Sequence, residues 1–525
     1  MSRTNNTAKR VEKFFAEMLG RHEIIHSETD FPLVDTNGKG HIYYPECFRQ
    51  VIETKSVKRM ARIFQLGTKI YSRPNVSHTR LEHSKGTYYR TLELLQNLYE
   101  DEKVKNIIVN NGYQKYMLAT LVRALLHDVG HGPFSHTMET VCNLPKGFHE
   151  KIGTRLVKED AELRNALNNV CPGIPEALEE IVQRNFLGLN RIFEGQSDLD
   201  RGDFLPRDSF FAAVNFEQNS RIVSELFNSV TLEKTTDTKG KTRIIPVFGA
   251  EQIGNLDAFF TNRFSNYKKI YYDPKGESYD YVFKAFAEEL LKSDENYGLK
   301  DFLTHNIDKK PEEIDLQEYI QFNDVEYLKG VMEVLEKTKN PTLKKLAMMS
   351  LPPKEKAEDI YFGLMVSEEQ VDENGNRKYT NESDEEFIRK LGKLPDSKTM
   401  YEQNCLTLNN NDLQNISSVI ERLKEALGIS QEQLEKIGIF SWNYTITSYK
   451  NKPGEETYVK GQEGKIYEYS VHPERKAPMQ QENVPGLCIL IPILEERGYN
   501  MQQIDAVRQI IKENNKQVET EEPNQ

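Results

Sequence analysis

The chain has 525 residues and a formal net charge of −12 at pH 7, with 38% hydrophobic, 10% aromatic and 29% charged residues. The length excludes a single small module, and the aromatic content excludes an intrinsically disordered chain, so two or three globular domains are expected. The acidic balance argues against chain-wide binding to nucleic-acid phosphates, although a local cationic pocket is compatible with it.

The five cysteines lie far apart and form no CxxC pair. This spacing indicates neither a disulfide framework nor a thiolate zinc site, and it fits a reducing compartment. No apolar segment follows the N-terminal MSRTNNTAKR, and no run approaches the ~18 apolar residues of a membrane-spanning helix. We therefore expect no membrane partner and a cytoplasmic location, or a nuclear one in a eukaryote.

Helical patterns dominate the first part of the chain. Residues 9–20 predict a short amphipathic helix, and residues 32–44 predict a small hairpin around Asn37-Gly38. Apolar residues then recur every three or four positions, most clearly in 113–128, 176–187 and 277–292. Residues 221–249 interrupt this pattern, because their alternation on both sides of Lys239-Gly240 predicts a projecting β-hairpin.

The pattern changes near residue 300, where charged stretches begin to separate shorter apolar patches. Segments 436–447 and 455–471 alternate β-branched and aromatic residues, and 486–493 predicts a buried strand. The expected fold is mainly α with small β-hairpins and a mixed α/β C-terminal lobe. The predicted regions are an N-terminal helical extension, the helical core, the C-terminal lobe and a disordered tail, at residues 1–30, 31–300, 301–515 and 516–525.

Six of the eleven histidines lie between residues 78 and 149. Among them, His127-Asp128 ends an apolar helix and is followed by the Gly- and Pro-containing segment VGHGPFSH, which predicts a turn that exposes several imidazoles. A His-Asp pair alone is weak evidence, since it occurs roughly once by chance in a chain of this length. Imidazole and carboxylate together are suitable ligands for a divalent metal that polarises a phosphate.

Five ordered motifs resemble one enzyme family over roughly residues 30–290. They are VKRMARIFQLG (57–67), HTRLEHSKG (78–86), ALLHDVGHGPFSH (124–136), GFHE (147–150) and SDLDRGDFLPRDS (197–209). Together they resemble the HD superfamily, and within it the deoxynucleoside-triphosphate triphosphohydrolases, which include bacterial dGTPase-like enzymes and the vertebrate SAM-and-HD-domain dNTPase. No SAM-type module is recognisable ahead of the matched region.

The resemblance implies a metal-dependent enzyme that releases deoxynucleoside and inorganic triphosphate by water attack on the α-phosphate. It implies Mn, Mg, Fe or Zn bound by His83, His127, Asp128 and Asp200. It also implies that His136 protonates the leaving 5′-oxygen, that Glu139 orients His136, and that His131 and His149 complete the set. The competing interpretation is that His131 and Glu139 only support the turn.

Substrate contacts are also implied by the resemblance. Gln65 and Leu66 match the pair that holds the 3′-hydroxyl and crowds the 2′ position, which implies a preference for deoxyribose. Tyr271 matches an aromatic residue that packs on the sugar or base, although the bare pattern favours a core residue. The cations expected at the phosphates are Arg80, Arg201, Lys268 and Lys269, although a lysine pair on a helix more often lies on a solvated face.

Three positions depart from the vertebrate branch. Phe204 stands where a tyrosine is usual, so a phosphate-contacting hydroxyl is absent. Lys58 and Ala61 stand where that branch uses Gln and Arg to hold an activating guanine nucleotide. The sequence therefore leaves open whether a nucleotide activator binds.

Two other functions compete with the dNTP triphosphohydrolase. One is an HD phosphohydrolase that acts on a monophosphate, cyclic nucleotide or alarmone, since the metal ligands alone do not choose among phosphate esters. The other is a nucleotide or single-strand nucleic-acid binding sensor, against which the acidic charge counts. The resemblance also implies a homo-oligomer, either a dimer or a tetramer.

Overall fold

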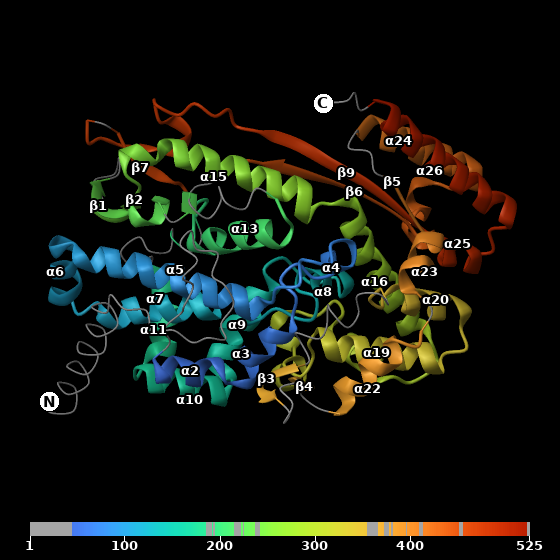
Figure 1. The fold of residues 1–525 in the computed structure, drawn as a ribbon, viewed down its shortest axis with the longest axis horizontal. Coiled ribbons are helices and arrows are strands. Elements are labelled where there is room, and N and C mark those ends of the chain that lie inside the picture. The colour runs from blue at the N-terminus through green and yellow to red at the C-terminus, as the bar shows by residue number, and fades with distance from the viewer. Residues whose placement is uncertain are drawn as a thin grey trace.

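A computed structural model describes most of the chain. The described residues are 45–184, 192, 195–214, 222–223, 225–236, 242–353, 366–371, 377–379, 382–394, 396–408, 413–450, 455–461 and 463–521. The helix predicted at 9–20 and the hairpin predicted at 32–44 lie outside them. The fold is mainly α with small antiparallel sheets and a mixed C-terminal part, which confirms the predicted fold class (Figure 1).

The first half of the fold is a group of packed helices. Its long helix, α5 (Arg80–Glu100), starts at a capping box in which Thr79 and Glu82 bond to each other's backbone, and it packs against α7 and α13. The helices are α2 (Glu46–Ile52), α3 (Lys55–Lys58), η1 (Arg59–Arg62), α4 (Lys69–Ser72), α5, α6 (Glu102–Asn110), α7 (Gln114–Leu126), α8 (His136–Val141), α9 (Phe148–Glu159), α10 (Ala161–Val170), α11 (Ile174–Arg184) and α13 (Leu199–Phe211).

The predicted hairpin at 221–249 is confirmed in its strands. Strands β1 (Thr231–Thr236) and β2 (Thr242–Val247) pair antiparallel, and the Lys239-Gly240 turn lies outside the described residues. More helices follow. They are η3 (Ala250–Gln252), α15 (Ile253–Asn266), η4 (Tyr267–Tyr271), α16 (Pro274–Lys292), α17 (Gly298–Asn306), η5 (Pro311–Glu313), α18 (Leu316–Tyr319), α19 (Asp324–Lys337) and α20 (Pro341–Met349).

The C-terminal part contains a three-stranded antiparallel sheet in the order β5-β9-β6. Helices α24 and α26 pack together over a second apolar core, at the C-terminal end of the molecule in Figure 1. The elements are β3 (Val366–Val371), β4 (Arg377–Tyr379), α22 (Glu382–Leu391), α23 (Ser397–Asn404), β5 (Cys405–Leu408), α24 (Leu413–Leu427), η6 (Gln431–Gln433), η7 (Glu435–Ile437), β6 (Ile439–Thr447), β7 (Tyr458–Lys460), β8 (Ile466–Glu468), η8 (Tyr469–Val471), β9 (Gln481–Leu490), α25 (Ile491–Glu496) and α26 (Met501–Glu521).

Two predicted elements end elsewhere than expected. The strand predicted at 486–493 stops at Leu490, because Pro492 cannot donate to a sheet but fits the first turn of α25. Helix α26 runs to Glu521, so helical backbone extends into the segment expected to be a disordered tail. The division at residue 300 stays a prediction, and the larger apolar core contains buried residues on both sides of it.

Candidate active site

Three helices bring the four predicted metal ligands together. His83 comes from α5, His127 and Asp128 follow the end of α7, and Asp200 lies in the first turn of α13. The Nε2 atom of His83 is 3.0 Å from Nε2 of His127 and 3.0 Å from Oδ1 of Asp200. The Oδ2 atom of Asp128 is 3.5 Å from His83 Nε2 and 3.6 Å from His127 Nε2. Residues 117 positions apart thus share one small volume.

This donor set fits a divalent cation. Imidazole nitrogens and carboxylate oxygens bind such ions at about 2.0–2.2 Å, which places neighbouring ligand atoms roughly 3.0–3.5 Å apart. The observed separations of 3.0 to 3.6 Å match that spacing before any ion is added. Burial lowers the pKa of His83, but hydrogen bonds with Asp200 and Asp203 outweigh burial and raise the pKa to about 10. A cation that binds His83 would therefore displace a proton.

Asp203 orients the His83 ring through Nδ1, the nitrogen opposite the one that faces the other predicted ligands. Its Oδ2 is 2.8 Å from His83 Nδ1, and both oxygens accept hydrogen bonds from the buried Arg207 at 2.8 and 2.9 Å. Gly86 makes this approach possible, because a Cβ at that position would lie 1.9 Å from Asp203 Oδ1. The sequence interpretation missed Asp203, although its place three residues after Asp200 on one helix was an available signal.

Asp203→Asn is expected to weaken metal binding about 10- to 100-fold, as the loss of such a hydrogen-bonding partner usually does. The amide keeps the size of the carboxylate, but it carries no negative charge to accept the hydrogen bond from His83 Nδ1. Titration calorimetry with Mn²⁺ measures the effect. Unchanged affinity in a folded D203N protein would show that Asp203 serves only to bind Arg207.

Arg80 is part of the protein framework. It is 4% exposed, and its guanidinium donates to Asp128 Oδ2 at 2.5 Å, to Ser135 Oγ at 2.8 Å and to the Gln65 carbonyl at 3.1 Å. These bonds engage all three nitrogens of the guanidinium. The predicted phosphate contact by Arg80 stays a prediction, and in this structure its charge balances Asp128.

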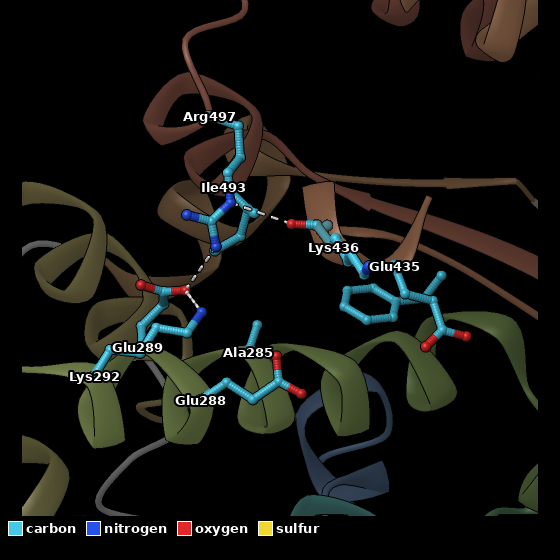
Figure 2. A pocket seen from close by; sticks show the side chains of 10 residues that line it. Ala285, Glu288, Glu289, Lys292, Glu435, Lys436, Ile493 and Arg497 are labelled. Carbon is cyan, nitrogen blue, oxygen red and sulfur yellow. Dashed lines mark hydrogen bonds and ion pairs between the residues drawn. The ribbon is translucent and has the colours of Figure 1, made fainter. Parts of the chain in front are cut away.

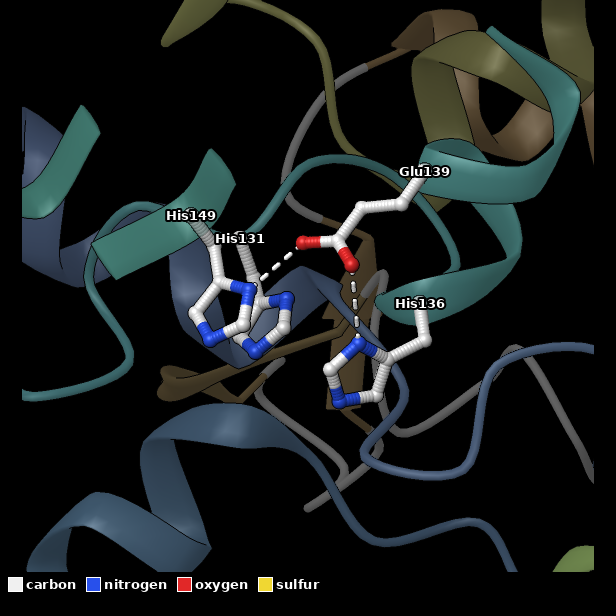
Figure 3. Close-up of side chains that lie close together, drawn as sticks. All are labelled: His131, His136, Glu139 and His149. Carbon is white, nitrogen blue, oxygen red and sulfur yellow. Dashed lines mark hydrogen bonds and ion pairs between the residues drawn. The ribbon is translucent and has the colours of Figure 1, made fainter. Parts of the chain in front are cut away.

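The second predicted group, His131, His136, Glu139 and His149, also assembles (Figure 3). The Glu139 carboxylate lies between two imidazoles, 3.2 Å from His136 Nδ1 and 2.5 Å from His149 Nδ1. His131 stacks on His149 with ring centroids 3.9 Å apart. The His136 side chain is 66% exposed, so it is the member of the group most open to an incoming molecule.

Charge differs among these groups. Burial and the charge of Arg80 hold the pKa of His131 well below its usual range, which favours the neutral imidazole. Burial alone would raise the pKa of Glu139, but hydrogen bonds with His136 and His149 lower it well below its usual range. All four donor atoms lie within 4.8 Å of one another, yet the 2.5 Å contact between His149 and Glu139 is a hydrogen-bond distance. The group therefore fits proton handling better than metal binding.

The other predicted substrate residues are already paired. Arg201 donates to Asp198 and to the Gly195 carbonyl, the latter at 2.9 Å. Lys268 forms an ion pair with Glu482 at 2.8 Å, on strand β9.

Around the expected sugar, Leu66 is partly buried and Gln65 is buried with its side-chain oxygen unpartnered. The Tyr271 hydroxyl donates to Asp208 at 2.6 Å. Phe204 lies edge-on between His83 and Tyr271, with centroids 6.2 and 6.1 Å away. The Phe204 ring therefore puts an apolar surface beside the predicted metal ligand His83.

A pocket of about 370 Å³ lies elsewhere, between α16 and the C-terminal part (Figure 2). Two of its three cations are already paired, because Glu289 binds Lys292 at 2.6 Å and Arg497 at 3.5 Å, and Glu288 and Glu435 add further negative charge. Such neutralisation does not suit a polyphosphate. In the described part of the chain, no helix is both long and apolar enough to cross a membrane.

Residues 80–203 match the family model named "HD domain", and this segment contains all four predicted ligands. Similar solved structures include a phosphohydrolase from Bacteroides thetaiotaomicron, which is 18% identical with a TM-score of 0.56 and covers 86% of this chain and 97% of its own. At that identity the likeness shows the shared fold.

Curated relatives match part of the chain. The uncharacterized protein YwfO of Bacillus subtilis is 24% identical over 277 residues, which are 52% of this chain and 59% of that protein. The deoxynucleoside triphosphate triphosphohydrolase SAMHD1 homolog of Dictyostelium discoideum is 22% identical over 320 residues, which are 58% of this chain and 55% of that protein. SAMHD1 of Xenopus laevis is 36% identical over 116 residues, 21% of this chain and 18% of that protein. The chain thus spans little more than half the length of YwfO and the Dictyostelium relative.

Proposed function

We propose that this protein is a metal-dependent phosphohydrolase that converts deoxynucleoside triphosphates into deoxynucleoside and inorganic triphosphate. The observation that carries the proposal is that Asp128 lies between the predicted metal ligands and the proton-handling group, and contacts both. Its Oδ2 belongs to the metal ligands, and its Oδ1 lies 3.5 Å from His131 Nε2 in the proton-handling group. A phosphate held at the cation would therefore lie beside the group that contains His136, whose ring centroid is 4.8 Å from that of His131.

A bound divalent cation would polarise a phosphate oxygen and lower the pKa of water. The protein's own residues supply the remaining chemistry. Water adds to the α-phosphorus and releases a proton to solvent, the bond to the 5′-oxygen breaks, and that oxygen takes a proton from an imidazole, which solvent then reprotonates. His136 suits this donation, because Glu139 engages its Nδ1 and leaves Nε2 to face the leaving group from an exposed side chain.

The preference for deoxyribose rests on the Gln65-Leu66 turn. Gln65 is fixed through its backbone, which accepts from Arg80 and donates to the His78 carbonyl at 2.9 Å. A turn fixed in this way can hold a 3′-hydroxyl with the Gln65 amide and present Leu66 to the 2′ position. Two relatives named as deoxynucleoside triphosphate triphosphohydrolases support this choice of substrate.

A substrate panel tests the proposal. Purified protein is incubated with each of the four dNTPs and with ATP, with and without GTP as activator, in Mn²⁺, Mg²⁺, Fe²⁺ or Zn²⁺. We expect inorganic triphosphate and deoxynucleoside from at least one dNTP, and slower turnover of the ribonucleotide. Absence of triphosphate under every condition would exclude the proposed reaction. Light scattering on the same samples tests the proposed dimer or tetramer.

One observation favours a second candidate, a phosphohydrolase acting on a smaller phosphate ester. Arg80, Arg201 and Lys268 are each paired with a carboxylate, so these cations would have to release their partners to bind a triphosphate. A monophosphate needs fewer cations. Release of orthophosphate from nucleoside monophosphates, without triphosphate from dNTPs, would favour it.

A further inference from the structure

The proposed site depends on two backbone segments that lie far from each other in sequence. One is the turn 64–67, which carries Gln65 and Leu66, and the other is the loop 129–136, which carries His131 and His136. They touch closely, since a Cβ at Gly67 would lie 2.4 Å from the Phe134 carbonyl oxygen. Phe134 and Ser135 have φ angles of 54° and 56°, which non-glycine residues adopt only when surrounding contacts hold them.

Asp324 bonds to both segments. Its Oδ2 accepts from the Phe64 backbone N–H at 2.8 Å, and its Oδ1 accepts from the Phe134 backbone N–H at 2.6 Å. The residue is 0% exposed and lies at the start of α19, beyond the segment that matches the HD domain. One carboxylate thus bridges the backbones of the turn and the loop, which are also joined by the Ser135 hydroxyl where it donates to the Phe64 carbonyl at 2.5 Å.

Arg59 and Tyr319 form hydrogen bonds with the loop 129–136 but not with the turn 64–67. Arg59 donates to the carbonyls of Val129 and His131 at 3.0 and 2.6 Å, and the Tyr319 hydroxyl donates to the Gly130 carbonyl at 3.1 Å. Arg80 also joins the segments, through the Gln65 carbonyl and Ser135 Oγ, but it binds Asp128 as well. Among the described residues, Asp324 forms no hydrogen bond or ion pair with His83, His127, Asp128 or Asp200, so its substitution separates loop placement from metal binding.

We propose that Asp324 is a positioning residue, which aligns the Gln65-Leu66 turn with the loop bearing His131 and His136 so that one substrate meets both. This inference rests on the proposed function. The start of α19 then contributes to the site through the position of these two segments. This position matters because a shift of about 1 Å between reacting groups can reduce turnover about 100-fold.

The test compares Asp324→Asn with Asp384→Asn. Asp384 is the control for loss of a buried carboxylate, because it is also 0% exposed but binds two side chains, those of Arg62 and Lys329, at 2.7 and 2.6 Å. In D324N the amide oxygen accepts one N–H, and the amide nitrogen then faces the second N–H as another donor. In D324A both N–H groups lose their acceptor, so its effect should be larger if the variant folds.

Three measurements on the full chain decide the matter. Hydrogen exchange at the Phe64 and Phe134 amides should be faster in D324N and unchanged in D384N. Mn²⁺ affinity should equal that of the unmodified protein in both. On the substrate found in the panel, kcat/KM of D324N should fall about 10- to 100-fold, whereas D384N should lose thermal stability without this loss.

Unchanged exchange at both amides in D324N would overturn the inference, as would equal kcat/KM in the two folded variants. If the unmodified protein hydrolyses no nucleotide, the proposed function fails. The exchange measurement then still determines whether Asp324 aligns the two segments.

Discussion

His127→Ala is expected to abolish specific binding of a divalent cation, and phosphohydrolase activity with it, while the protein stays folded. The imidazole contributes a nitrogen 3.0 Å from His83 Nε2 and 3.4 Å from Asp200 Oδ1, and its other nitrogen lies 2.9 Å from the Ala124 carbonyl. Loss of a direct ligand should exceed the roughly 10- to 100-fold cost of losing an outer partner. Titration with Mn²⁺ and measurement of bound metal report this loss.

His127 is a cleaner choice than Asp128. Removing Asp128 would leave the buried Arg80 without its carboxylate, and breaking such a pair costs about 3–5 kcal/mol of folding stability. The His127 side chain is 18% exposed, and the two carboxylates beside it keep other partners when it is removed, because Asp128 pairs with Arg80 and Asp200 lies 3.0 Å from His83.

The matched control is His305→Ala, which removes an exposed histidine on α17 that pairs with Glu318. Added Mn²⁺ should raise the Tm of H305A as it raises that of the unmodified protein, and should leave the Tm of H127A unchanged. Normal Mn²⁺ stoichiometry and affinity in H127A would place the metal elsewhere.

The sequence was sufficient to predict which residues share the site, because their types and order carry the information. These residues lie on or beside helices whose apolar periodicity is visible, and the helices place His83 Nε2 3.0 to 3.5 Å from donor atoms of His127, Asp128 and Asp200. The resemblance supplied the roles, and those roles stay predictions until they are measured.

What the side chains bind was harder to predict, because burial requires counter-charges that no local pattern reveals. Arg80 resembled a phosphate ligand but balances Asp128, and Arg201 folds back onto the helix-capping Asp198. The role of Asp324 could not be predicted for another reason. It binds the backbone of Phe64 and Phe134, which lie 260 and 190 residues earlier in the sequence. Such contacts follow from the packing of whole helices.

Glu139→Gln is expected to reduce kcat about 100- to 10,000-fold, the usual range for a lost proton transfer, with little change in Mn²⁺ affinity. The carboxylate serves both His136 Nδ1 and His149 Nδ1. A glutamine has one acceptor oxygen, so its amide nitrogen would face one of the rings as a donor. The proton on His136 would then no longer be directed to the leaving oxygen.

Two comparisons separate proton donation from a general loss of structure. Glu318→Gln is the matched control, because Glu318 engages His305 Nδ1 at 2.9 Å in an exposed pair, and kcat should not change. The second comparison uses a p-nitrophenyl phosphate ester, whose leaving group departs without a proton. The loss of kcat in E139Q should largely disappear on this substrate. An equal deficit on both substrates would rule out His136 and Glu139 as the proton donor system and assign Glu139 to holding the loop in place.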